Sequence, residues 1–311
     1  MNPLPLAQFE RVLVVRTDHI GDLVLSTPFL RALRNGLPQA HITARVAPYT
    51  QEVLASSGLV DRIVTETPAE EFQLAVCLAP RSHSYKLTYA SKAPVRVGYY
   101  YAGRPLVAVA TRLWLTHRAR VVVDPEGVVA HEIDQLASLA SLMGLDYDQR
   151  ELELGIERPR PGASLVLHLG TRWFTGEWKV EHLAQLTDRL GSVTVTHGPA
   201  EARQAAELKA LRPGLEVIGG LSFKEWATTL GAAQAVVSCD TGAVHVAAAM
   251  GRPVVVAYEP DVMKLCSQQW APWRVEHRAC AKLEPALAIP RLVQAVEELV
   301  GKKRMQADSA P

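Results

Sequence analysis

The fold class is decided by the run Arg11-Val12-Leu13-Val14-Val15-Arg16 and by the turn Thr17-Asp18-His19-Ile20-Gly21-Asp22 that follows it. The first six residues are mostly β-branched and apolar, which is typical of a strand buried on both faces of a parallel sheet. A helical pattern follows the turn, and Pro28 either kinks that helix or begins it, with Ser26 or Thr27 as the cap. Strand-turn-helix units of this kind predict an α/β fold with parallel sheets.

The same pattern continues along the 311 residues and then restarts. Residues 146–162 are charged and contain two prolines, so we place a domain boundary there. The sequence predicts an N-terminal Rossmann-like domain at 1–155, a C-terminal one at 156–301 and a flexible tail at 302–311. Predicted strands are 41–46, 62–64, 74–78, 95–98, 165–169, 193–197, 235–239 and 253–257, and predicted helices are 49–57, 131–143, 180–190, 201–211, 222–230, 242–250 and 290–300.

Composition narrows the classes of partner. Lys plus Arg is 33 and Asp plus Glu is 32, so the net charge of +1 lacks the positive field of a general nucleic-acid binder. The first ten residues have no secretory pattern, and no apolar run reaches 18 residues, so we expect a cytoplasmic protein. The mixed run 106–123 predicts a surface helix and a strand, although its Arg, Trp and Leu side chains would also suit contact with a membrane.

Three polar turns follow predicted strands of the second half, at 170–172, 197–199 and 240–242. Open parallel sheets bind ligands at the carboxyl ends of their strands. The turn Asp240-Thr241-Gly242 precedes a helix whose free N–H groups and positive dipole end suit a pyrophosphate. His245 shares a helix face with Thr241 and could donate to a phosphate or a ribose. Asp240 as the N-cap of an ordinary helix explains the same residues.

The turn after the first strand carries Asp18, His19 and Asp22. Carboxylates and an imidazole at a strand end suit the removal of a proton from an acceptor hydroxyl, and Asp22 is the candidate base. A purely capping role for Asp22 remains the alternative. Arg81 and Lys86 could bind acceptor phosphates, or they could belong to a solvated helix start.

Two motifs together resemble one family. Arg16-Thr17-Asp18-His19-Ile20-Gly21-Asp22 with Ser26-Thr27-Pro28, and Asp240-Thr241-Gly242-Ala243-Val244-His245 with the following alanines, resemble the bacterial ADP-heptose:lipopolysaccharide heptosyltransferases, glycosyltransferase family 9. The resemblance implies a GT-B fold, in which two Rossmann-like domains have parallel sheets facing a central cleft. It also implies inverting transfer of a sugar from an ADP-sugar to a lipopolysaccharide-core or other glycan acceptor, with no cofactor and no required metal.

The resemblance also assigns roles to residues. Asp22 resembles the base that activates the acceptor, with Asp18 and His19 beside it. Asp240, Thr241, Gly242 and His245 resemble the ADP-sugar site, Thr171 a phosphate contact and Glu201 a nucleotide contact. The family usually has a Lys two residues before the Trp that matches Trp178, where this sequence has Gly176, so Arg172 or Lys179 would have to supply the cation.

The implied partners are a nucleotide-sugar donor and a lipid-linked or cell-surface glycan acceptor, with peripheral contact at the cytoplasmic face of the inner membrane. Two alternatives stay open. One is a nucleotide-sugar epimerase on the same two-domain plan, which needs no acceptor. The other is a homologue that binds a nucleotide or a glycan without turnover, which the substitution at Gly176 motivates.

Overall fold

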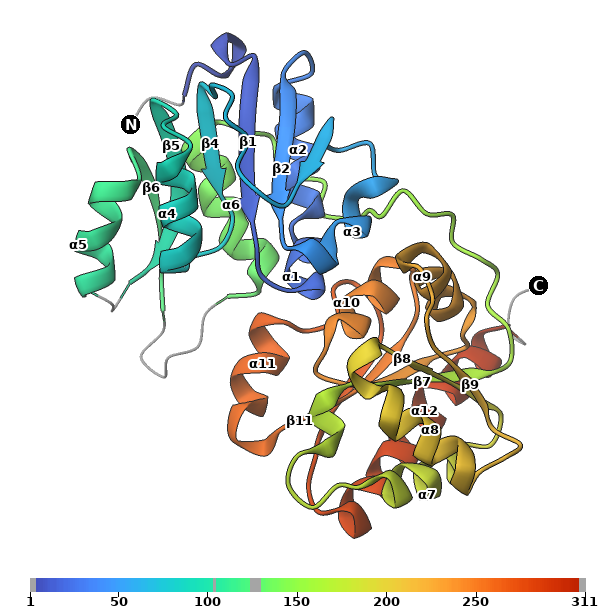
Figure 1. The fold of residues 1–311 in the computed structure, drawn as a ribbon. Helices are drawn as coiled ribbons and strands as arrows, with labels where there is room; N and C mark the ends of the chain where they lie inside the picture. The colour runs from blue at the N-terminus through green and yellow to red at the C-terminus, as the bar shows by residue number, and fades with distance from the viewer. Residues whose placement is uncertain (1–3, 103–104, 124–129, 308–311) are drawn as a thin grey trace. The chain divides into compact units, whose positions relative to one another are not determined.

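The computed structural model describes residues 4–102, 105–123 and 130–307. The chain divides into two compact units, Met1–Gly155 and Ile156–Pro311, which we call unit 1 and unit 2. Each unit is a parallel sheet covered by helices (Figure 1). This is the α/β architecture of two Rossmann-like domains that the sequence predicts.

The sheet of unit 1 has six parallel strands in the order β3-β2-β1-β4-β5-β6. β1 (Arg11–Arg16) lies in the middle, where Val12 pairs with Ile42 on one side and with Leu74 on the other. Five of its six residues are buried, which confirms the prediction of a strand covered on both faces. The remaining strands are β2 (His41–Val46), β3 (Arg62–Val64), β4 (Leu74–Cys77), β5 (Val95–Tyr101) and β6 (His117–Val121).

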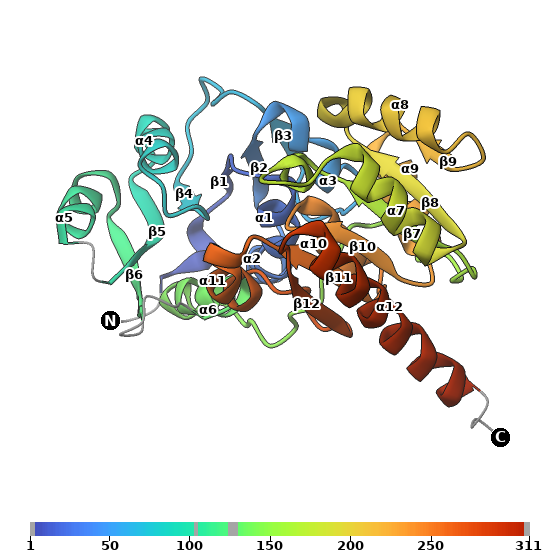
Figure 2. The same cartoon turned by 90° about the horizontal axis from the view of Figure 1, so that it is seen from below.

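The helices of unit 1 settle the alternatives at Pro28. α1 (Ile20–Leu25) ends at Ser26, and Ser26 is the N-cap of α2 (Thr27–Gly36), so Pro28 begins a second helix rather than kinking the first. α4 (Ser82–Ala90) and α5 (Pro105–Trp114) lie on one face of the sheet, and α6 (Glu132–Met143) lies on the other (Figure 2). α6 ends at Gly144, whose φ of 74° confirms the predicted glycine cap. The segment predicted as one helix at 49–57 consists of a 3-10 turn, η2 (Pro48–Thr50), and a short helix, α3 (Glu52–Ala55). Another 3-10 turn, η1 (Leu6–Gln8), precedes β1.

The sheet of unit 2 repeats this topology in the order β12-β11-β10-β7-β8-β9. Its strands are β7 (Leu165–Leu169), β8 (Val193–His197), β9 (Glu216–Ile218), β10 (Val236–Cys239), β11 (Val254–Tyr258) and β12 (His277–Ala281). The strand order reverses between β7 and β10, as it does between β1 and β4 of unit 1. The carboxyl ends of strands at such a reversal are where open parallel sheets bind ligands.

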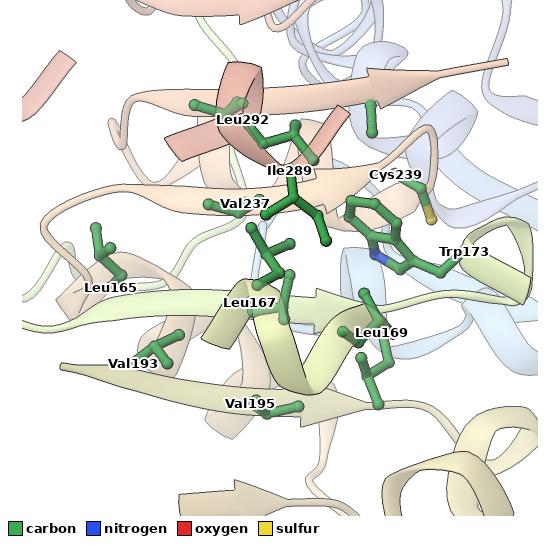
Figure 3. Packing of buried hydrophobic residues seen from close by; sticks show 14 of the residues in the cluster. Leu165, Leu167, Leu169, Trp173, Val193, Val195, Val237, Cys239, Ile289 and Leu292 are labelled. Atoms are coloured by element: carbon green, nitrogen blue, oxygen red, sulfur yellow. The ribbon is translucent and has the colours of Figure 1, made fainter. Parts of the chain in front are cut away.

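The core of unit 2 forms where helices cover this sheet. Leu167, Val195 and Val237 stand on three strands and are fully buried (Figure 3). Ile289 and Leu292 of α12 (Pro285–Ala307) and the indole of Trp173 pack against them. Burial of each large apolar side chain contributes about 1.5–3 kcal/mol, which gives the strand ends a rigid support.

Four other helices of unit 2 begin and end close to the predicted residues, whereas α11 was not predicted. α9 (Phe223–Ala232) has the predicted capping box, in which Ser222 accepts from the N–H of Glu225. The helices are α7 (Val180–Leu190), α8 (Ala202–Leu211), α10 (Gly242–Ala249) and α11 (Met263–Gln269), with 3-10 turns η3 (Thr171–Phe174), η4 (Pro199–Glu201) and η5 (Pro260–Val262).

The prediction for the last helix was wrong. α12 runs from Pro285 to Ala307, and Pro290 lies inside it. The missing N–H of Pro290 falls on an exposed position, while Ala288, Ile289 and Leu292 are buried in the core, so packing outweighs the lost hydrogen bond. The predicted tail at 302–311 therefore begins as helix, and residues 308–311 lie outside the described residues. The edge strands β9 and β12 were not predicted, because their apolar runs are short and half-buried.

Candidate functional site

Acidic side chains converge on one buried arginine at the carboxyl end of β1. The guanidinium of Arg16 has Nε 2.9 Å from a carboxylate oxygen of Asp18, and Nη2 lies 3.3 Å from Asp22 and 3.1 Å from Glu132. The hydroxyl of Tyr99 donates to the same Glu132 oxygen at 2.9 Å. We call Arg16, Asp18, Asp22, Glu132 and Tyr99 the Arg16 cluster.

Ion pairs between buried side chains stabilise the Arg16 cluster. Burial acts to lower the pKa of Arg16, but the three carboxylates reverse this and raise it well above its ordinary value. Arg16 also donates to the backbone carbonyl of Leu78, just beyond β4. The sequence placed Arg16 in the first motif without a role, and it missed Glu132 and Tyr99, because no local pattern links them to β1.

Asp22 is held in position from two sides and stays accessible. One oxygen faces Arg16, and the other accepts the backbone N–H of His19 at 3.2 Å, which is a capping interaction at the start of α1. The side chain is 15 % exposed, whereas those of Arg16 and Glu132 are 2–3 % exposed. The carboxylate therefore caps α1 and also reaches solvent, so the two interpretations of Asp22 are compatible.

Of the other residues predicted for the acceptor side, His19 and Arg81 lie around the same strand end and Lys86 does not. The ring Nδ1 of His19 is 3.1 Å from the hydroxyl of Tyr49, and that hydroxyl donates to the backbone carbonyl of Asp18. Burial, and then Asp18 and Asp22, raise the pKa of Tyr49, while Arg81 lowers it, so Arg81 lies within electrostatic reach of this turn. Lys86 is exposed one turn into α4, and no contact links it to the Arg16 cluster in the described residues.

The raised pKa of Asp18 should make the free energy of unfolding depend on pH. Burial, with Asp22 and Glu132 nearby, raises its pKa from 3.8 to about 6 despite the attraction of Arg16. A carboxyl whose pKa is higher in the folded state favours folding at low pH, and this contribution is lost as the pH rises through 6. Between pH 7 and pH 4 the wild type should therefore gain stability relative to Asp18→Asn, by at most roughly 3 kcal/mol.

Urea denaturation of both proteins across this pH range measures the gain. The exposed Asp148→Asn variant is the matched control and should follow the wild type at every pH. A stability difference between wild type and Asp18→Asn that stays constant, or that changes in the opposite direction, would contradict the raised pKa.

In unit 2, the turns after β7 and β10 touch. Gly170 lies so close to Thr241 that a Cβ on residue 170 would come within 2.5 Å of the threonine methyl group, which explains the glycine. Two residues further on, Arg172 pairs with the carboxylate of Asp240. The Arg172 side chain is 49 % exposed, so the guanidinium keeps donors free for a ligand that is anionic.

The start of α10 completes this arrangement. Thr241, not Asp240, is the N-cap, which corrects the interpretation of Asp240 as a cap. No side chain caps the helix, and the Thr241 hydroxyl is 3.0 Å from that of Ser238. Thr241 and Gly242 are partly exposed, whereas His245, one turn further on, is buried with 5 % exposure. Helix N–H groups beside Arg172 can therefore bind a phosphate.

The remaining donor-side candidates divide into two groups. Thr171 is exposed at the start of η3, next to Arg172, and Glu201 lies against the turn at Gly198, after β8, the neighbour of β7. Lys179 instead lines a surface pocket with His182, Glu284 and Pro285. Of the two cations proposed to replace the lysine at Gly176, Arg172 is the one that contacts Asp240.

A buried lysine supports the turn that carries Arg172. Lys282 follows β12, its side chain is 2 % exposed, and Nζ lies 2.6 Å from Glu259. It also donates to the carbonyl of Arg172 at 2.5 Å and to the hydroxyl of Thr175. Burial acts to raise the pKa of Glu259, but the hydrogen bonds from Lys282 and Thr175 hold it below its ordinary value. The sequence missed Lys282 because β12 was not predicted.

The position of the absent family lysine has a local explanation. Gly176 comes directly after Thr175, which Lys282 contacts. Its φ is +65°, a backbone conformation that residues with a Cβ rarely adopt. The turn after η3 therefore favours glycine here. Two cations lie near it, Arg172 paired with Asp240 and Lys282 paired with Glu259.

Lys282→Met should lower the free energy of unfolding of unit 2 by about 1–3 kcal/mol, because it leaves the Arg172 carbonyl and Glu259 without this donor. Urea denaturation followed by tryptophan fluorescence measures the loss, since five of the six tryptophans belong to unit 2. The exposed Lys224→Met on α9 is the matched control and should change stability by less than about 0.5 kcal/mol. Equal stabilities of the two variants would show that Lys282 does not support the turn.

Two negative findings hold for residues 4–102, 105–123 and 130–307. None of their helices combines the length and the apolar character needed to cross a membrane. Nor do they contain a group of three His, Cys, Asp or Glu side chains arranged to hold a metal ion. The three carboxylates of the Arg16 cluster already surround a guanidinium.

Two matches in sequence agree on one family. The sequence model "Glycosyltransferase family 9 (heptosyltransferase)" matches residues 68–288. The chain is 32 % identical to lipopolysaccharide heptosyltransferase 1 of Pseudomonas aeruginosa over 290 residues, which cover 80 % of this chain and 79 % of the relative.

Solved structures agree on the fold. The glycosyl transferase family 9 structure from Veillonella parvula superposes with a TM-score of 0.75 at 17 % identity, over 97 % of this chain and 100 % of the other. E. coli heptosyltransferase WaaC with ADP superposes with a TM-score of 0.71 at 19 % identity, over 93 % and 99 %. The two Rossmann-like units thus have the GT-B fold, and the chain belongs to glycosyltransferase family 9, the heptosyltransferase family.

Proposed function

We propose that this glycosyltransferase moves a heptose from ADP-heptose to a lipopolysaccharide-core acceptor, with inversion at the sugar carbon. The observation that carries the proposal is the pairing of Arg172 with Asp240 at the start of α10, beside Thr241. A cation and free helix N–H groups at one strand end form a site for a diphosphate. A relative solved with ADP supports the choice of nucleotide.

Unit 2 holds the donor in this proposal. The first N–H groups of α10 and the Arg172 guanidinium bind the diphosphate, and Thr171 and Thr241 offer hydroxyl groups to it. Glu201 lies by the next strand end, where its carboxylate suits the ribose hydroxyls. His245 is buried, so its part is to pack the start of α10 beneath the ligand.

Unit 1 supplies the base and holds the acceptor. Asp22 takes the proton of the acceptor hydroxyl while the oxygen bonds to the anomeric carbon, and the bond from that carbon to the β-phosphate oxygen breaks. The electron pair of the broken bond leaves with ADP, whose charge Arg172 and the helix end stabilise. Arg16 fixes the orientation of Asp22. In this proposal Asp18, His19, Arg81 and Lys86 are assigned to acceptor binding.

The proposed chemistry uses no cofactor and requires no metal. The transferred proton is taken up by Asp22, which lies beside Arg16. The negative charge that develops on the diphosphate lies beside Arg172. We further propose that the enzyme works in the cytoplasm, at the face of the inner membrane, because a lipopolysaccharide-core acceptor is attached to a lipid. The relative's name supports this acceptor class.

The test is a transfer assay with ADP-heptose and a lipopolysaccharide-core acceptor, read by mass spectrometry of both products. We expect ADP and one heptosylated acceptor in equal amounts. Conversion of the donor when it is incubated alone would favour the epimerase, and ADP binding without transfer to any acceptor would favour a non-catalytic homologue. Either result would overturn the proposal.

Arg172→Ala should raise the dissociation constant for ADP about tenfold to a hundredfold, because it removes a charged hydrogen bond and leaves Asp240 facing the diphosphate. Isothermal calorimetry measures the change. Lys179→Ala is the matched control, since Lys179 lines a different pocket, and it should keep the wild-type affinity. The opposite ranking of the two variants would assign the diphosphate to the Lys179 pocket.

A further inference from the structure

One half of the sheet in unit 1 carries basic residues without any acidic ones. Residues 72–123 contain eight Lys or Arg residues and no Asp or Glu, in a chain where the two kinds are nearly equal in number. This segment forms β4, α4, β5, α5 and β6, so three strands at one edge of the sheet and the helices on one of their faces form a single basic region. In a protein of net charge +1, the charge is concentrated on this region.

The outer face of α5 is apolar and uncovered. Leu106, Val109 and Leu113 are 85 %, 60 % and 72 % exposed, and their spacing places them on one side of the helix. Another side of α5 is packed, since Thr111 is buried and Val107 and Trp114 pack against Tyr85, with the Trp114 and Tyr85 ring centroids 5.9 Å apart. α5 is therefore anchored to the sheet by one side and presents aliphatic side chains on the other.

Exposed cations lie on α5 and on the neighbouring elements of the same segment. Arg112 on α5 and Arg120 on β6 are exposed, and so are Lys86 on α4 and Lys92 just after it. α4 and α5 cover the same face of the sheet (Figure 2). We call Leu106, Val109, Leu113, Lys86, Lys92, Arg112 and Arg120 the α5 face.

Aromatic rings accompany the arginines of the same segment. The Arg96 guanidinium lies 5.4 Å from the ring centroid of Tyr89, which is 53 % exposed, and Arg118 lies 5.4 Å from that of Tyr100. Basic groups beside tyrosines and exposed aliphatic chains are the combination found where proteins rest on a lipid surface. Phosphates of a nucleic acid would satisfy the cations but would leave the three aliphatic side chains in water.

We propose that the α5 face docks onto a membrane surface rich in anionic phospholipid, with Leu106, Val109 and Leu113 inserted among the lipid chains and the exposed cations on the headgroups. The purpose of this docking rests on the proposed function, because the enzyme would meet a lipid-linked acceptor at the membrane surface. The docking itself requires neither a donor nor an acceptor.

The test is co-sedimentation of the full chain with vesicles of phosphatidylethanolamine and phosphatidylglycerol, compared with vesicles of phosphatidylcholine alone. We expect binding to the anionic vesicles that weakens as salt is added, since headgroup attraction is screened. Arg112→Gln with Arg120→Gln should lower the partition coefficient roughly twentyfold, given about fivefold for each basic residue at such a surface. Leu106→Gln with Leu113→Gln should lower it at least about tenfold.

Matched controls come from unit 2. Leu211 and Leu287 are 42 % and 49 % exposed, so Leu211→Gln with Leu287→Gln changes apolar surface of the same kind elsewhere. Arg203→Gln with Lys224→Gln removes two exposed positive charges outside the α5 face. Both control variants should sediment with vesicles like the wild type. Circular dichroism of all four variants should match the wild type, because every substituted side chain is exposed.

Several results would overturn the proposal. They are absence of binding to anionic vesicles, equal binding to both kinds of vesicle, and equal effects of the α5 and control variants. Binding of an RNA oligonucleotide that depends on the arginines but not on the leucines would assign the face to nucleic acid instead. Transfer to a water-soluble, delipidated acceptor should be unchanged in the α5 variants. Loss of that transfer in the wild type would count against the proposed function and not against docking.

Discussion

Asp22→Asn is expected to lower the turnover number for sugar transfer by about a hundredfold to ten thousandfold, the usual contribution of a positioned general base. The amide has the shape of the carboxylate, and its oxygen can still accept the His19 N–H that Asp22 accepts. It cannot take a proton from the acceptor hydroxyl. The expected loss is therefore chemical rather than structural.

Two measurements separate these causes. ADP affinity by calorimetry should stay at the wild-type value in Asp22→Asn, because the residues proposed to bind the donor belong to unit 2. The exposed Asp148→Asn, also in unit 1, should keep wild-type turnover. Turnover of Asp22→Asn within a few-fold of the wild type would remove Asp22 from the proposed mechanism, while leaving the family membership of the chain untouched.

Arg16→Gln is expected to lower the free energy of unfolding of unit 1 by about 3–5 kcal/mol, because it leaves carboxylates buried without their countercharge. Asp18 and Glu132 both face Arg16 with almost no access to water, so solvent cannot replace the guanidinium. Hydrogen exchange of the β1 amides measures the change in unit 1 directly. Arg11→Gln, at the exposed first position of the same strand, is the matched control and should have little effect.

The ionic origin of this loss can be tested by a second substitution and by pH. Arg16→Gln with Glu132→Gln should recover more than about 1 kcal/mol, since it removes one of the uncompensated charges. Burial raises the pKa of Asp18, and Arg16 opposes this rise, so the variant without Arg16 should be least destabilised at acid pH. A loss that is independent of pH and additive with Glu132→Gln would point to packing rather than to charge.

The two polar turns of the candidate site could be predicted from short stretches of sequence. Asp22 and His19 follow β1 directly, and Asp240, Thr241 and Gly242 follow β10, so polar residues that come after apolar, strand-like runs indicate both turns. The partners of these residues were not predictable in this way. Glu132 reaches Arg16 across 116 positions, and Lys282 reaches Thr175 across 107.

The sequence by itself determined the alternation of buried strands and amphipathic helices, the boundary between the two units and the turns that carry the polar side chains. These are local properties, because periodicity, caps and turn residues act over a few positions of the chain. Only the tertiary structure decided that Arg16 would balance three carboxylates, and that Lys282 would support the turn of Arg172 beside the glycine at 176. Such contacts depend on the order of strands in each sheet, which brings distant segments together and which no short-range pattern encodes.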